Sequence, residues 1–206
     1  MAGSARAQEA IHNTALARVE ALALLQTLNA DLLSHDSATL TLERWCGTHH
    51  LAADPRLHAE LVHGQDKVLT AAQRKELGIS AEEPVRYRRV RLSCGGHVLS
   101  EADNWYVPRL LTPEMNRQLD ETDTPFGRVV LSLGFTRHTL AADLLWQPLP
   151  AGWESAPLPA DGPGTLPIPQ EVLQHRAVLT TRDGTPFCEV VETYQRAMFA
   201  FPLPGS

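Results

Sequence analysis

Arg88, Arg89 and Arg91 stand close together in a segment whose residues alternate in the manner of a β-strand. With a period of two, Arg89, Arg91 and Ser93 fall on one face, and Arg88 and Val90 fall on the other. Two guanidinium groups on the same face are suited to a bidentate grip on a carboxylate or a phosphate. The alternative is that these side chains form the solvated outer face of a sheet and hold no ligand.

Helices followed by antiparallel hairpins are expected to hold these arginines in place. The capping box formed by Thr70 and Gln73 predicts one short helix, and Thr112 before a proline predicts another. Gly95-Gly96 and Asp183-Gly184 each predict the tight turn of a hairpin. The expected helices lie at 10–33, 37–50 and 70–77 and start again near Thr112 and Thr124; the expected strands lie at 57–62, 85–94, 97–107, 134–146, 171–181 and 185–199. Helices that precede hairpins indicate an α+β fold.

Two stretches allow alternatives. Residues 134–146 are interpreted as a strand, although their Ala-Ala-Asp-Leu-Leu segment favours a helix by propensity alone. Residues 148–169 hold seven of the fifteen prolines and predict a surface loop, either a flap over a site or an inert insertion. The domain prediction is an N-terminal helical extension over 1–36 and a single α+β domain over 37–206.

Length and charge exclude several classes of protein. The 206 residues suit one domain, and the formal net charge of −6 without a Lys/Arg run argues against a nucleic-acid partner. No apolar run approaches the ~20 residues of a membrane span. Three scattered cysteines predict buried thiols in a reducing compartment, hence the cytoplasm. The pattern Ala5-x-Ala7 keeps an exported, periplasmic protein as the alternative.

The other groups of residues that could have a function give weaker signals. Cys46, His49 and His50 are metal-ligating residue types, but they lack the paired spacing of a zinc site, and no metal is expected. Trp105 and Tyr106, together with Trp146, either line a ring-binding pocket or belong to the core. Motifs for acyl transfer, nucleotide hydrolysis and dinucleotide binding are absent from the sequence.

Four motifs in order resemble the chorismate lyase (chorismate–pyruvate lyase) family. They are RYRRVRLSCGGHVLSEADNWYVP at 86–108, TDTPFGR at 122–128, LGFTRHTL at 133–140 and GTPFCEVVETY at 184–194. This fold is shared with the effector-binding domains of some GntR-type regulators. The resemblance implies a six-stranded antiparallel sheet with helices on one side and flaps over a buried pocket. It also implies conversion of chorismate to 4-hydroxybenzoate and pyruvate, a step of ubiquinone biosynthesis, without metal or organic cofactor.

The resemblance also implies roles for particular residues. Arg89 matches the family arginine that holds a ligand carboxylate, and the backbone of Phe126 and Gly127 matches a segment that lines the pocket. The carboxylate of the last strand matches either Glu192 or Glu189, with Glu192 favoured. These two residues differ by an odd number, so only one of them faces the pocket of a regular strand. The implied catalytic residues are therefore Arg89 with Glu192 or Glu189.

One departure changes the charge expected in the pocket. The second family arginine is replaced here by Asn104, which follows Asp103, with Glu101 nearby. Chorismate is a dianion, and a buried site that loses a guanidinium loses charge compensation. Other arginines could restore the charge: Arg88, Arg91 or Arg137. Otherwise the ligand is less acidic, hydroxylated or amine-bearing, or Asp103 and Glu101 lie outside the pocket as solvated charges.

Two classes of function follow. One is a cofactor-free lyase acting on chorismate or a related carboxylated ring, in which Glu192 or Glu189 would bind the ring hydroxyl or move a proton. The other is a non-catalytic protein that binds an aromatic or cyclic acid with the same fold. The expected partner is in both cases a small molecule, and the sequence carries no signal for the oligomeric state.

Overall fold

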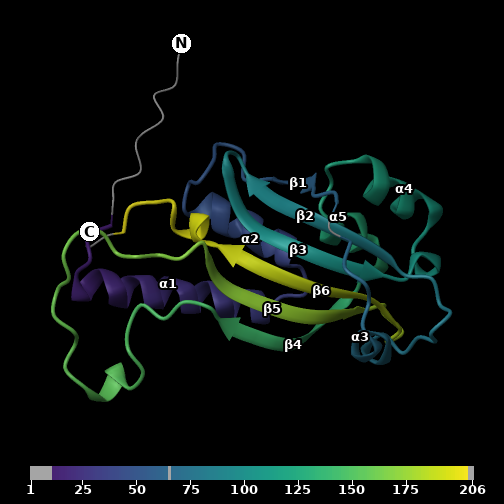
Figure 1. Cartoon of the computed structure of the whole chain (residues 1–206). Coiled ribbons are helices and arrows are strands. Elements are labelled where there is room, and N and C mark those ends of the chain that lie inside the picture. The colour runs from purple at the N-terminus through teal and green to yellow at the C-terminus, as the bar shows by residue number, and fades with distance from the viewer. Residues whose placement is uncertain (1–10, 65, 204–206) are drawn as a thin grey trace, which may run out of the picture.

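A single antiparallel sheet of six strands organises the chain (Figure 1). The computed structural model describes residues 11–64 and 66–203. The strands are β1 (Leu57–Leu61), β2 (Arg86–Cys94), β3 (His97–Tyr106), β4 (Thr136–Leu144), β5 (Glu171–Thr180) and β6 (Pro186–Gln195). Their order across the sheet is β1-β2-β3-β6-β5-β4, so β1 and β4 form the two edges. The predicted α+β fold with a six-stranded antiparallel sheet is confirmed.

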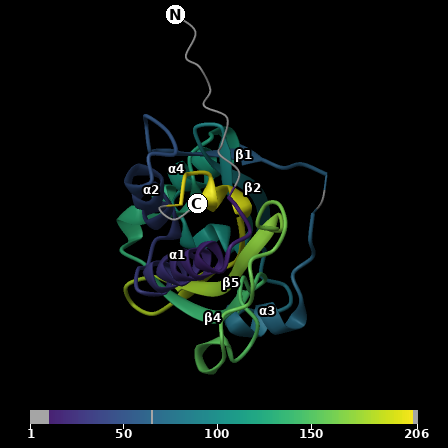
Figure 2. The ribbon, with the colours of Figure 1, turned by 90° about the vertical axis from the view of Figure 1, so that its left-hand side faces the viewer.

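Two long helices cover one face of the sheet, and a short helix lies on the other side (Figure 2). The α-helices are α1 (Ala15–Leu33), α2 (Ala38–Thr48), α3 (Ala71–Glu76), α4 (Pro113–Glu121) and α5 (Phe126–Val129). Short 3-10 turns follow at η1 (Pro108–Leu110), η2 (Leu131–Leu133), η3 (Trp153–Ser155) and η4 (Arg196–Phe199). Nowhere in the described ranges does a helix have the length and apolar character needed to cross a membrane.

Side-chain caps fix where the helices begin. Thr14 and Ser37 accept hydrogen bonds from the first turns of α1 and α2, so α1 begins at residue 15 and not near residue 10. The predicted capping box of Thr70 and Gln73 is present at α3. Thr112 caps α4, as its position before a proline predicted.

The hairpins are those that the turn residues predicted. Cys94 pairs with His97 across Gly95-Gly96, and the β5–β6 turn passes through Asp183-Gly184. Residues 136–144 form strand β4 despite the helical propensity of their Ala-Ala-Asp-Leu-Leu segment. Pairing with β5 overrides local propensity there, as tertiary context often does.

The hydrophobic core has two parts. The larger part lies between α1, α2 and the sheet, where Leu25, Leu28 and Leu32 of α1 are fully buried. The smaller part surrounds Phe126 and Phe187 beneath α4 and α5. Each fully buried side chain of this size contributes roughly 1.5–3 kcal/mol through the hydrophobic effect. The two parts meet above the centre of the sheet, which is where a cavity is found.

One cysteine prediction is wrong. Cys46 near the end of α2 and Cys94 at the end of β2 form a disulfide, with Cα atoms 6.5 Å apart, whereas free buried thiols were expected. Their separation of 48 residues hid the pairing, because only the packing of α2 on β2 brings them together. Cys188 remains a free buried thiol. The pattern Ala5-x-Ala7, on which the export alternative was based, lies outside the described residues.

The proline-rich loop at 148–169 does not cover the cavity. It runs beside the start of α1, where the Asp161 carboxylate accepts a hydrogen bond from the Ala15 amide and Gly162 donates to the Asn13 carbonyl. An isolated bridge also joins Thr165 to His12. The flap interpretation of this loop is therefore wrong for the cavity described below.

Candidate functional site: a small cavity beneath helix α2

A small cavity, here called the inner cavity, lies between the sheet and helices α2 and α5. Its volume is about 30 Å³, room for one or two water molecules. Its apolar walls include Val90, Leu92, Ala102, Phe126, Phe135 and Val190. Its polar side chains include Asn104, Arg137 and Glu192. An apolar lining with a few convergent polar groups is typical of a small-molecule site.

Strand alternation decides which side chains reach the inner cavity. In the central strands the cavity-facing positions are even-numbered, such as Val90 on β2, Asn104 on β3 and Glu192 on β6. Arg137 comes from edge strand β4, where it pairs with Leu179 of β5. Of the two glutamates that the sequence left open, Glu192 lines the inner cavity and Glu189 does not.

A buried ion pair forms the polar end of the inner cavity. Arg137 Nη2 donates to Glu192 Oε2 at 2.6 Å, and the two side chains are only 4% and 9% exposed. Tyr194, fully buried, donates its hydroxyl to the same oxygen at 3.1 Å. Burial and the charge of Glu192 raise the pKa of Tyr194, so its hydroxyl remains a donor. The Glu192 carboxylate is thus held by two donors.

One N–H donor of the Arg137 guanidinium has no acceptor among the described residues. That donor is the Nε atom, which is buried. Burial is the largest single influence and lowers the pKa of Arg137, but Glu192, with Tyr194 and Cys188, outweighs it, so the pKa lies above its ordinary value. Such an orphaned donor costs roughly 1–3 kcal/mol unless it finds a partner. An acceptor on a ligand in the inner cavity would satisfy it.

The start of α2 and of α5 forms the roof of the inner cavity. Asp36 accepts a hydrogen bond from the Arg137 amide at 2.8 Å, which ties the α1–α2 connection to β4. Gly127 approaches α2 so closely that an added Cβ would lie 2.9 Å from Thr39 Oγ1 and 3.3 Å from Ser37 Oγ. This position has no room for a side chain, and the two sequence-predicted residues Phe126 and Gly127 both line the inner cavity.

Sequence reasoning missed a second polar pair near the inner cavity. His175 of β5 is fully buried, pairs across strands with Glu192, and its Nε2 lies 2.8 Å from Asn29 Oδ1 of α1. Burial lowers the pKa of His175 to about 4, so the ring is neutral near pH 7. Tyr194 was missed as well. A signal existed for Tyr194, because it stands two residues after Glu192 and buried strands place such neighbours on one face.

The arginine assigned to the ligand carboxylate points away from the inner cavity. Arg89 lies on the opposite face of the sheet, and its neighbour Arg88 lies on the cavity side. Arg88 is buried, yet its guanidinium donates to the carbonyls of Leu119 and Thr124 at 3.1 and 3.2 Å. Burial lowers the pKa of Arg88 to about 10. The role transferred to Arg89 therefore has no geometric basis in this cavity.

Arg89 and Arg91 form a network of charges with two carboxylates on that opposite face. Glu101 accepts from Arg89 at 2.7 Å and from Arg91 at 3.3 Å. Asp103 accepts from Lys67 at 2.5 Å and from the hydroxyl of Tyr87. The expectation that Arg91 and Asp103 contact a ligand in the pocket is thus not supported by their positions. The alternative stated for Asp103 and Glu101, that they lie outside the pocket, matches the structure.

Glu189 lies on this opposite face as well and is fully buried. Burial raises the pKa of its carboxyl group, an effect that Gln73 of α3 and Arg176 of β5 oppose. Arg176 Nη1 stands 3.7 Å from its Oε1. Glu189 and Glu192 are thus two buried glutamates of one strand on different faces, which makes them a matched pair for mutagenesis.

The weaker sequence candidates are accounted for by the fold. Cys46 is in the disulfide and His49 stacks on Phe201 with ring centroids 4.0 Å apart. Across residues 11–64 and 66–203, no group of three or more His, Cys, Asp or Glu side chains could hold a metal ion. Trp105 donates to the Lys67 carbonyl on the opposite face, and Trp146 packs on Phe199 in the core.

Comparison with known proteins gives one close relative in sequence. The uncharacterized protein y4mC of Sinorhizobium fredii (strain NBRC 101917 / NGR234) is 55% identical over 193 residues, which cover 93% of this chain and 81% of that protein. A scan against protein-family models finds no match.

Solved structures share the fold at low sequence identity. PhnF from Mycobacterium smegmatis is similar over 82% of this chain and 68% of its own length, with 16% identity and a TM-score of 0.52. Its effector domain alone is similar over 78% of this chain and 89% of the domain, with 15% identity and a TM-score of 0.51. The chain spans 62% of YydK from Bacillus subtilis, a possible transcriptional regulator, at a TM-score of 0.43. Further similar structures are described as GntR-family transcriptional regulators. The expected likeness to regulator effector domains is confirmed at the level of the fold.

Proposed function

The chain belongs to the same family as the uncharacterized protein y4mC of Sinorhizobium fredii, and from this premise we propose that it binds a small molecule in the inner cavity. The observation that carries the proposal is the buried Arg137–Glu192 pair, whose Arg137 Nε has no acceptor within the described structure. The similarity in fold to the effector domain of PhnF supports a binding role.

The charge of the inner cavity favours a ligand without a net negative charge. Glu192 already neutralises Arg137, and the other nearby guanidinium, that of Arg88, is directed at backbone carbonyls. A ligand carboxylate beside Glu192 would place two negative groups around one buried cation, at a desolvation cost of several kcal/mol. A ring that carries a hydroxyl and an amide offers an acceptor to Arg137 and a donor to Glu192 with no added charge.

Ligand entry requires the walls to open. A cavity that holds benzene measures about 150 Å³, several times the volume found here. The roof at Ser37–Thr39 and at Phe126-Gly127 is built from helix starts, which can shift as units more easily than the paired strands beneath them. Binding should therefore be slower than diffusion and should order these segments.

A chorismate lyase is the second candidate function. Its support is that Glu192 and the Phe126-Gly127 backbone line the inner cavity, as the family resemblance implies for a pocket carboxylate and a pocket segment. The difficulty is charge, because chorismate is a dianion and Arg89 lies on the other face of the sheet. We expect no formation of 4-hydroxybenzoate from chorismate by the purified protein.

Two ring compounds of nearly equal shape test the proposed ligand class. Calorimetric titration of 4-hydroxybenzamide and 4-hydroxybenzoate should give tighter binding of the neutral amide to the wild type, by about tenfold or more. In Glu192→Gln the preference should reverse, because Arg137 is then free to pair with the ligand carboxylate. Glu189→Gln, the matched change on the opposite face, should leave the preference unaltered.

Three results would overturn these assignments. Absence of binding of both compounds to the wild type refutes the ligand class. An equal effect of Glu192→Gln and Glu189→Gln refutes the inner cavity as the site. Formation of 4-hydroxybenzoate from chorismate that Glu192→Gln abolishes and Glu189→Gln retains would replace the binding role by the lyase.

A further inference from the structure

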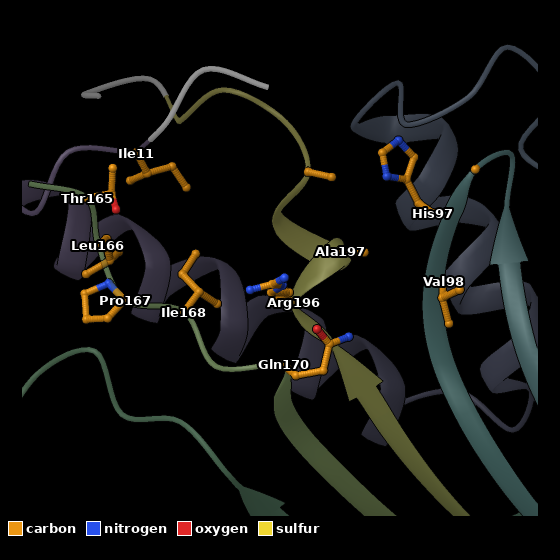
Figure 3. Close-up of a pocket in the computed structure, with 12 residues that line it drawn as sticks. Ile11, His97, Val98, Thr165, Leu166, Pro167, Ile168, Gln170, Arg196 and Ala197 are labelled. Carbon is orange, nitrogen blue, oxygen red and sulfur yellow. The ribbon is translucent and has the colours of Figure 1, made fainter. Parts of the chain in front are cut away.

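An open groove, drawn in Figure 3, shares no lining residue with the inner cavity. Its volume is about 630 Å³, within the usual range of small-molecule pockets. One wall comes from the proline-rich loop and η4, and the other from His97 and Val98 at the start of β3. We call this space the terminal groove.

Hydrogen bonds hold the walls of the terminal groove in place. The Leu166 amide donates to the Ile11 carbonyl at 2.8 Å, and the Arg196 amide donates to the Gln170 carbonyl at 2.8 Å. Gln170 Nε2 donates in turn to Gln195 Oε1 at 2.9 Å. Three segments distant in sequence are thus fixed to one another by backbone contacts, so the groove is preformed. A preformed site avoids much of the ordering cost of binding.

The lining of the terminal groove combines a cationic group with an apolar surface. Arg196 is exposed, and no carboxylate of the described chain forms an ion pair with it. Its neighbours along the wall are Leu166, Pro167 and Ile168 (Figure 3). No aspartate or glutamate is among the described residues that line the groove, although the whole chain has 24 acidic residues and a net charge of −6. The described lining of the groove therefore places one cationic side chain beside apolar ones, without an acidic side chain among them.

We propose that the terminal groove is a second binding site, for a small organic anion with an apolar body. Arg196 would pair with the carboxylate through a charge-assisted hydrogen bond. The apolar body would cover Pro167, Ile168 and Ala197, whose exposed surface contributes roughly 25 cal/mol for each Å² removed from water. The ligand class is opposite in charge preference to that of the inner cavity, so the two sites bind different molecules.

The isoleucines of the chain allow a direct test with octanoate as the probe. The sequence contains three isoleucines; Ile11 and Ile168 line the terminal groove, and Ile79 lies beside α3. In methyl NMR spectra of the isoleucine-labelled full chain, octanoate should shift the methyl signals of Ile11 and Ile168. The methyl signals of Ile79 should not shift. 1-Octanol, which has the same chain without the charge, should bind about tenfold more weakly or worse.

Matched arginine variants decide whether Arg196 carries the recognition. Arg196→Gln should lower the affinity for octanoate by about tenfold or more and should leave the affinity for 1-octanol unchanged. Arg182→Gln removes an exposed arginine from the β5–β6 turn and should have no effect. Octanoate affinity that survives Arg196→Gln, or shifts that appear at Ile79 and not at Ile11 and Ile168, would overturn the proposal. So would the absence of any octanoate shift in the wild type.

Discussion

Removing one member of the buried Arg137–Glu192 pair should destabilise the protein far more than removing both. We expect Arg137→Leu and Glu192→Leu each to lower the free energy of unfolding by about 3–5 kcal/mol, because each leaves the other charge buried without its partner. The double variant Arg137→Leu/Glu192→Leu should lie within about 1 kcal/mol of the wild type, since no uncompensated charge remains.

The magnitude follows from the geometry of the pair. At an effective dielectric constant of about 20, unit charges 2.6 Å apart attract by roughly 6 kcal/mol. Burying side chains that remain only 4% and 9% exposed costs several kcal/mol for each ion and offsets most of that attraction. A single replacement loses the attraction but keeps the cost of burying the remaining ion. The pair itself therefore contributes little net stability.

Urea unfolding at pH 7.5, followed by far-UV circular dichroism, measures these free energies by linear extrapolation. The control is the exposed pair Arg117–Glu114 on α4, whose side chains are 60% and 52% exposed. Alanine at either control position should lower the free energy of unfolding by no more than about 1 kcal/mol. Losses below 1 kcal/mol for both single cavity variants would mean that water solvates the charge left behind, and would refute the argument from the burial of the pair.

Three further predictions concern stability and the cavity roof. Because burial lowers the pKa of His175 from 6.5 to about 4, the unfolded chain binds more protons than the native state between these pH values. Stability should therefore fall as the pH drops through this window, by about 3 kcal/mol from His175, in urea titrations at stepped pH. Gly127→Ala places a methyl group 2.9 Å from Thr39 Oγ1 and should cost about 1–3 kcal/mol in urea unfolding. Reduction of the Cys46–Cys94 disulfide, which spans 48 residues, should lower the free energy of unfolding by about 4 kcal/mol, seen as a lower urea midpoint with dithiothreitol.

Each of these predictions has a matched control. His175→Gln should flatten the pH dependence, and an unchanged slope would mean that other groups cause it. Gly96→Ala adds a Cβ that meets nothing within 4 Å, so a loss equal to that of Gly127→Ala would contradict the steric argument. The variant Cys46→Ser/Cys94→Ser should no longer respond to dithiothreitol. A response that persists would show that the reductant acts elsewhere.

Local signals in the sequence were sufficient for most of the fold. Caps at Thr70 and Thr112 located two helices, because a side chain that satisfies free amides acts within one turn. Turn glycines and strand alternation located the hairpins in the same way. The sheet order and the packing of α1 depend on contacts between distant segments, which local signals do not contain.

The site was harder to predict because it depends on which face of the sheet is covered. Alternation placed Arg88 and Arg89 on opposite faces but did not say which face lies beneath α2. The family resemblance then selected Arg89, which faces away from the inner cavity. Glu192 was the favoured glutamate, and the structure places it at the inner cavity. The disulfide and the course of the 148–169 loop depend on tertiary contacts and had no local signal.

The most direct test of the central claim is the ratio of two dissociation constants, those of 4-hydroxybenzoate and 4-hydroxybenzamide. We predict a ratio well above one for the wild type, because Glu192 repels the acid, and a ratio below one for Glu192→Gln, because Arg137 is then free to bind it. A ratio that is the same in both proteins would contradict the account, since the Arg137–Glu192 pair would then take no part in binding.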